Sequence, residues 1–99
     1  MIVVRYEWRF QRSQMQEVLK MFFAVNVPEK SELLNYRSYK SITGLEETLA
    51  LEWEFESMAK WEEFQPKFGA ANREALRDWP NAIQSKIEVW QVLEPPAKS

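Results

Sequence analysis

The strongest constraint on the fold is an alternation of apolar and polar residues in two separate parts of the chain. From Ile2 to Phe10 every second residue is aliphatic or aromatic, and three charged residues lie between them. The segment Glu47–Glu56 repeats the alternation, with leucine, tryptophan and phenylalanine opposite three glutamates. Because successive side chains of a strand point to opposite faces, each segment is predicted to be a strand with one buried and one polar face.

A helix is predicted between the first strand and a loop over residues 26–32. Ser13 is a favourable N-cap residue, and Gln16 three positions later completes a capping box. Apolar residues then recur at helical spacing as far as Val25. Pro28 is expected to end this helix, because proline lacks the N–H that a helix interior needs.

A second strand is predicted over residues 33–42, although its apolar residues fall on both faces. Thr43 and Gly44 predict a turn that joins it to the strand at 47–56 as a hairpin. Ser57 then predicts the N-cap of another helix.

The helix after Ser57 is expected to be interrupted at Pro66 and Gly69. A further helix is predicted over 70–79, and Pro80 stops or kinks it. Its expected inner face comprises Ala71, Ala75, Leu76 and Trp79. A last strand is predicted over 86–93.

The predicted element order, β-α-β-β-α(α)-β, is that of an α+β, ferredoxin-like fold. Right-handed crossovers would place the first and third strands at the centre of a four-stranded antiparallel sheet, with the helices on one face. At 99 residues the chain is expected to form a single domain over 1–95, followed by a short polar tail at 96–99.

Composition excludes several classes of function. The chain has no Cys and no His, so disulfides, thiolate chemistry, histidine-based triads and histidine-ligated haem are unavailable. Thirteen basic and fifteen acidic residues argue against nucleic-acid binding. Charges at Arg5, Glu7 and Arg9 interrupt the N-terminal apolar segment, and no apolar run is long enough to cross a membrane. We therefore expect a cytoplasmic protein without a metal or cofactor.

The polar face of the predicted sheet is the first candidate site, because it mixes aromatic rings with charges of both signs. It is either exposed to water, with its ions paired across strands, or covered by a second copy of the chain, which would create a polar pocket between two sheets. Arginines there would bind a carboxylate or phosphate. The candidate ligand-binding residues on this face are Arg5, Arg37, Tyr39, Glu52, Glu54 and Trp90.

The glutamates of the third predicted strand have two possible functions. One of them could act as a general acid or base, or together they could bind a cation. Their spacing matches no calcium-loop motif, and pairing with arginine or exposure to water explains them as well.

The helix-facing side is the second candidate site. Trp61, Phe64, Phe68 and Trp79 are predicted to point inward, either as ordinary core residues or around an apolar pocket. Trp61 and Trp79 are the candidate ligand-binding residues on this side.

Three stretches resemble the dimeric α+β barrel superfamily, which includes NIPSNAP-like proteins, stress-responsive A/B barrel proteins and antibiotic-biosynthesis-type monooxygenases. They are the opening Val3–Arg9, the acidic and aromatic Trp53–Phe64, and the closing Ile87–Val92. The resemblance covers nearly the whole chain and implies a homodimer whose two sheets form a barrel. It is informative about fold more than about function.

The haem-degrading branch of that superfamily uses an Asn early in the first strand, a Trp on the helix after the third strand, and a His. Trp61 lies on the matching helix, but the first strand has no Asn and the chain has no His. The resemblance implies the homodimer, and our first hypothesis is that this homodimer binds a small polar or aromatic molecule in or near the barrel. The alternatives are a cofactor-independent oxygenase or isomerase, and a structural dimer without a ligand.

Overall fold

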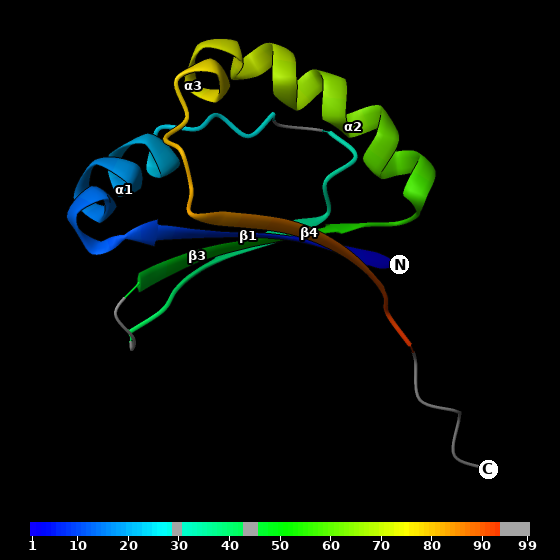
Figure 1. Cartoon of the computed structure of the whole chain (residues 1–99). Helices are drawn as coiled ribbons and strands as arrows, with labels where there is room; N and C mark the ends of the chain where they lie inside the picture. The colour runs from blue at the N-terminus through cyan, green and yellow to red at the C-terminus, as the bar shows by residue number, and fades with distance from the viewer. Residues whose placement is uncertain (29–30, 43–45, 94–99) are drawn as a thin grey trace.

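A computed structural model describes residues 1–28, 31–42 and 46–93 and contains one four-stranded antiparallel sheet with helices on a single face (Figure 1). The strand order is β2-β3-β1-β4, which confirms the predicted ferredoxin-like topology. The expected turn at Thr43–Gly44 and the tail at 96–99 lie outside the described residues. The strands are β1 (Ile2–Gln11), β2 (Asn35–Lys40), β3 (Glu46–Phe55) and β4 (Gln84–Gln91).

The two alternating segments form the central strands with the faces that the sequence predicts. Ile2 pairs with Phe55 at one end of the β1–β3 ladder, and Trp8 pairs with Leu49 towards the other. Val4, Leu49 and Phe55 are fully buried under the helices. Arg5 lies opposite Glu52 on the uncovered face, which we call the open face.

The first helix begins and ends differently from the prediction. β1 continues to Gln11 and is followed at once by a 3₁₀ turn, η1 (Arg12–Gln14), so Ser13 lies inside a turn and is not the N-cap. An N-cap residue needs an extended backbone, and here Gln11 has it, with the Gln14 side chain accepting the Gln11 N–H at 3.1 Å. α1 (Met15–Phe23) then stops well before Pro28.

The second and third helices also differ from the prediction. α2 (Met58–Ala71) begins after Ser57, whose hydroxyl accepts the Lys60 N–H as the predicted N-cap. It continues through Pro66 and Gly69, where an interruption was expected. The carbonyl that loses its helical partner belongs to exposed Glu62, so water can bind it. Consequently α3 (Arg73–Arg77) is only five residues long.

The hydrophobic core is divided into two clusters at opposite ends of the sheet. One cluster lies under α2 and is built from Ile2, Val4, Trp53, Phe55 and Phe64. The other lies under α1 and is built from Phe10, Met15, Val18 and Leu49. Among the described residues, neither cluster covers the middle of the sheet.

Candidate functional site

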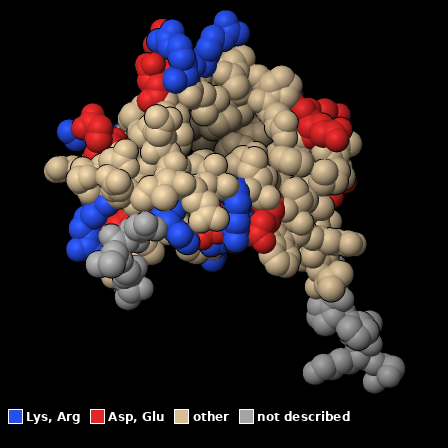
Figure 2. Space-filling model, in the orientation of Figure 1, with Lys and Arg blue, Asp and Glu red and all other residues tan. Residues whose placement is uncertain are grey.

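A pocket of about 800 Å³ lies between the two core clusters, with the sheet as its floor and the helices around it. Figure 2 shows this hollow between the helix layer and the sheet, with mostly uncharged residues at its rim. All four strands contribute to the floor, and the helices and the segment after α1 contribute the walls. Its lining residues are Tyr6, Trp8, Phe22, Phe23, Val25, Val27, Tyr36, Ser38, Leu51, Trp53, Gln65, Phe68, Gly69, Leu76, Trp79, Ser85, Lys86 and Ile87.

The pocket exists because the helices are too short to cover the sheet. A ten-residue strand such as β1 spans about 33 Å, whereas the nine residues of α1 span about 14 Å. The two longer helices pack over opposite ends, and five-residue α3 does not fill the space between them. Aromatic rings therefore surround an open space instead of closing on one another.

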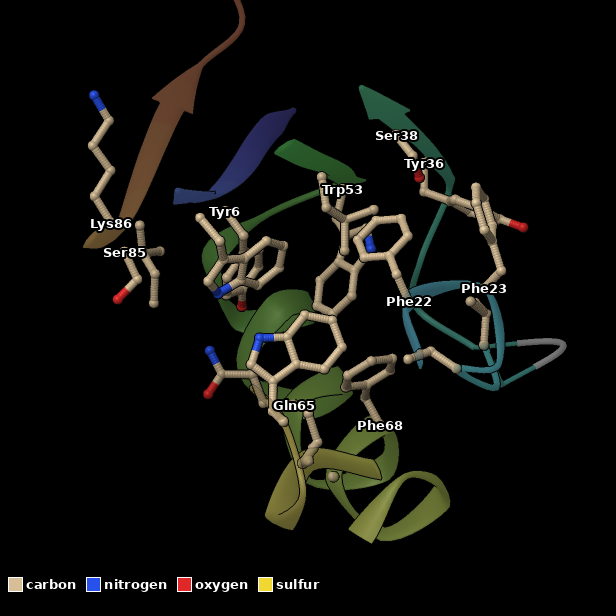
Figure 3. A pocket seen from close by; sticks show the side chains of 18 residues that line it. Tyr6, Phe22, Phe23, Tyr36, Ser38, Trp53, Gln65, Phe68, Ser85 and Lys86 are labelled. Carbon is tan, nitrogen blue, oxygen red and sulfur yellow. The ribbon is translucent and has the colours of Figure 1, made fainter. Parts of the chain in front are cut away.

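The rings that line the pocket support one another. Trp53 contacts Tyr6 and Phe68 edge to face, with ring centroids 5.0 and 4.8 Å apart. On the other side Trp8 lies 5.5 Å from Trp79 and 6.3 Å from Phe22. Figure 3 shows Tyr6 and Trp53 rising from the sheet towards Phe22 on α1 and Phe68 on α2. A flat, largely apolar molecule would find aromatic faces and edges on several sides.

The Tyr6 phenol is the hydroxyl group on the central strand β1 of the pocket floor. Burial raises the pKa of this phenol, and the nearby Trp61 indole N–H lowers it by a smaller amount. Tyr6 therefore keeps its proton at neutral pH and can act as a hydrogen-bond donor.

Lys86 is the one charged residue among those that line the pocket. Its ammonium lies 3.3 Å from a Glu88 carboxylate oxygen and 3.5 Å from one of Glu7. Hydrogen bonding and charge from Glu88, followed by Glu7, raise the pKa of Lys86. The lysine therefore stays charged and is held by acidic residues of the open face.

The open face brings three of the predicted site residues together. Arg5 Nη1 donates to Glu52 Oε2 at 2.7 Å, and Tyr39 Oη donates to Glu52 Oε1 at 3.0 Å. The Arg5 guanidinium also lies 5.7 Å from the centre of the Tyr39 ring. These groups satisfy one another across β1, β3 and β2, as the cross-strand pairing interpretation expects.

The other predicted residues of the open face are more dispersed. Arg37 lies on exposed β2 opposite Glu52, and Glu54 lies opposite Val3. Trp90 also lies opposite Val3, on β4, and is 55% exposed in the single chain. The hollow found on this face, beside Glu7 and Lys86, measures about 60 Å³ and has room for only a few water molecules.

The two predicted residues of the helix side have different places. Trp79 lines the pocket, whereas Trp61 packs beside the cluster under α2, behind Tyr6. Phe68 also lines the pocket, while Phe64 is fully buried core.

Tyr6, Trp8, Phe22 and Trp53 line the pocket but were not predicted as site residues, because their spacing is also that of ordinary core. The shortage of small residues among so many rings is the signal in the sequence that points to such a space.

No family model and no curated protein matches the sequence. Solved structures do match over nearly the whole chain. A candidate antibiotic biosynthesis monooxygenase from Deinococcus radiodurans has a TM-score of 0.72 and 11% identity, covering 100% of this chain and 99% of that one. A dimeric ferredoxin-like protein from an uncultured marine organism has a TM-score of 0.70 and 14% identity, covering 99% and 92%.

A third match is a MhuD variant solved with two manganese protoporphyrin IX molecules per active site. Its TM-score is 0.75 at 16% identity, and the match covers 99% of this chain and 100% of that one. NIPSNAP-like proteins from Burkholderia xenovorans match as well. At these identities the likeness establishes the fold, which is the ferredoxin-like α+β fold found in these proteins, and confirms the resemblance noted in the sequence.

The described residues contain no candidate for a membrane span or for a metal site. No helix among them has the length and hydropathy to cross a membrane. Within residues 1–28, 31–42 and 46–93, no three acidic side chains come together in a way that could hold a metal ion.

Proposed function

We propose that this protein binds a largely apolar, aromatic small molecule in the pocket between its helices and its sheet. The observation that carries the proposal is the 800 Å³ space lined by aromatic rings from the sheet, α1 and α2. Leaving such a space open costs packing energy that a better-filled core would recover, and a ligand that fills it would restore those contacts.

The MhuD neighbour supports the same kind of occupant, because its structure holds a flat, mostly apolar ring system. Haem itself fits this chain poorly. The sequence has neither His nor Cys, so imidazole or thiolate ligation of the iron is impossible. The proposed ligand is therefore an aromatic compound that needs no imidazole or thiolate ligand from the protein.

Pyrene is a suitable probe, since it is flat, uncharged and changes its emission spectrum when it leaves water. We expect the purified protein to bind pyrene at micromolar concentration, with emission typical of an apolar surrounding and energy transfer from tryptophan. An emission spectrum that remains that of pyrene in water, at protein concentrations up to the millimolar range, would contradict the proposal.

Gly69 offers a sharp variant, because it lines the pocket and a Cβ added there would meet nothing within 4 Å. Gly69→Phe should fill part of the pocket and weaken pyrene binding roughly tenfold. Phenylalanine has a higher helix propensity than glycine, so the change should not weaken α2. Ala70→Phe, at the exposed neighbouring position outside the pocket, is the matched control and should leave pyrene binding unchanged.

We also propose that the protein is a homodimer in which the open face meets a second copy. Trp90 and Val92 are exposed at the β4 edge of this face and Tyr39 at the opposite, β2 edge, and exposed aromatic residues are enriched at interfaces. The face carries charges of both signs, so that two copies related by a two-fold axis can be complementary. The dimeric ferredoxin-like neighbour supports a dimer of this fold.

A further inference from the structure

We infer that the pocket selects an uncharged ring compound carrying a hydrogen-bond acceptor, and that the Tyr6 hydroxyl binds this acceptor. The inference rests on the proposed function and names the class of ligand. It follows from two features of the pocket, which are the position of the Tyr6 hydroxyl and the scarcity of charged groups.

The Tyr6 ring is held in a defined orientation. It stacks on Trp8 with centroids 5.9 Å apart and meets Trp53 edge to face. The ring belongs to central strand β1, where Tyr6 lies between Leu51 on β3 and Ile87 on β4. A ligand on the pocket floor would therefore meet this phenol at a fixed place.

The Tyr6 hydroxyl can donate its proton to a ligand. The nearby Trp61 indole N–H is only a donor, so it cannot accept the Tyr6 proton, and its nitrogen has no hydrogen-bond partner in the described part of the chain. No group in the described part of the chain accepts the Tyr6 proton with hydrogen-bond geometry. Tyr6 lines the pocket and is not fully buried, so an acceptor on a bound molecule can supply the missing partner (Figure 3).

Besides the indole N–H groups of Trp8, Trp53 and Trp79, the remaining polar groups of the pocket lie at its margins. Tyr36 and Ser38 belong to edge strand β2, which is exposed along its whole length. Ser85 and Lys86 belong to edge strand β4, and Gln65 is exposed on α2. Tyr6 thus carries the hydroxyl that is placed to contact the middle of a ring compound lying across the sheet.

The pocket offers little to a charged ligand. No Asp or Glu is among its lining residues, and its one cation, Lys86, already lies beside Glu7 and Glu88. A carboxylate or ammonium group in the pocket would lose its water without gaining a partner of opposite charge. Charged relatives of a neutral ligand should therefore bind much more weakly.

The test compares three probes of the same ring system by equilibrium dialysis: fluorene, its ketone 9-fluorenone, and a fluorenone carboxylate. We expect the wild-type protein to bind fluorenone about five- to tenfold more tightly than fluorene, as one added hydrogen bond would give. The carboxylate should bind at least about tenfold more weakly than the ketone. Equal or tighter binding of the carboxylate would overturn the claim of an uncharged ligand.

Tyr6→Phe keeps the ring and removes the hydroxyl, so it should abolish the preference for fluorenone while fluorene binding stays the same. Tyr39→Phe makes the same change on the open face, outside the pocket, and should retain the preference. If the preference survives in Tyr6→Phe, Tyr6 is not the donor, although the proposed function stands. If fluorene itself fails to bind the wild type, the proposed function fails. The preference is a ratio measured within one variant, so modest changes in stability do not alter it.

Discussion

At the scale of single residues, Asn72 explains why α1 ends where it does. Asn72 is almost fully buried, and its amide donates to the Asn26 carbonyl at 2.7 Å and to the Phe68 carbonyl at 3.0 Å. Its carbonyl oxygen accepts the Asn26 N–H at 2.7 Å. Both backbone groups of Asn26 therefore bond to the Asn72 side chain and are not available for helical hydrogen bonds. The neighbouring residues Val25 and Val27 line the wall of the pocket.

Asn72→Ala should destabilise the protein by about 2–4 kcal/mol, because it leaves the peptide groups of Asn26 without partners in a partly buried place. Urea unfolding, monitored by circular dichroism, measures this change in the free energy of unfolding. Asn81→Ala, an exposed control, should change stability by less than about 0.5 kcal/mol. Equal effects of the two substitutions would mean that the Asn72 contacts contribute nothing net.

At the scale of elements, an ion pair connects the segment that precedes β2 to α2. Lys67 on α2 donates to the carboxylate of Glu32, whose side chain is only 12% exposed. This hydrogen bond, and then the backbone N–H of Glu32 itself, lower the pKa of the Glu32 carboxyl below its ordinary value of 4.5. Burial and the charge of Lys67 contribute less, in opposite directions.

A carboxyl whose pKa is lowered by folding stabilises the folded state above the unfolded pKa, and this contribution is lost as pH falls through the folded value. Lys67→Met should therefore lower the free energy of unfolding at pH 7, and its difference from wild type should shrink as pH drops below about 4.5. Urea titrations at several pH values measure the trend. Lys20→Met, at an exposed position on α1, is the control and should follow the wild-type profile. A difference that stays constant down to pH 2 would contradict the role of Glu32.

At the scale of the whole molecule, the sheet has two different surfaces with different expected occupants. The helix side carries two separate core clusters with the pocket between them. The open face carries paired ions and exposed aromatic residues. Because neighbouring strand residues point to opposite faces, a ligand on one side and a second copy on the other would not compete for the same side chains.

The proposed dimer should have twice the 11.9 kDa mass of one chain in native mass spectrometry and in sedimentation at micromolar concentration. Trp90→Glu puts a charge into the proposed interface and should produce monomers. Val89→Glu makes a comparable change at the neighbouring residue, which is also exposed but on the helix side, and should remain dimeric. A wild-type monomer at these concentrations would contradict the dimer.

The topology and the faces of the sheet could be predicted from the sequence because strand alternation is a local property. Arg5, Tyr39 and Glu52 were placed on one face by counting residues, and the structure brings them into contact. The prediction of Ser57 as an N-cap likewise depends only on neighbouring residues, and the structure confirms it. In contrast, α2 continues through Pro66, where local propensity favours a break, because contacts of Phe64 and Phe68 with Trp53 hold both sides of the proline on the sheet.

The sequence by itself determined which residues face the helices and which face away, since a period of two leaves each side chain only one choice. Only the tertiary structure decided that the helix-facing residues form two clusters with a pocket between them. That outcome depends on where α1 ends and where α2 gives way to α3. Asn72, between α2 and α3, holds the segment after α1 through hydrogen bonds to Asn26, which is 46 residues away in the chain. The aromatic residues look alike in sequence, so packing alone separates Phe64 in the core from Phe68 at the pocket.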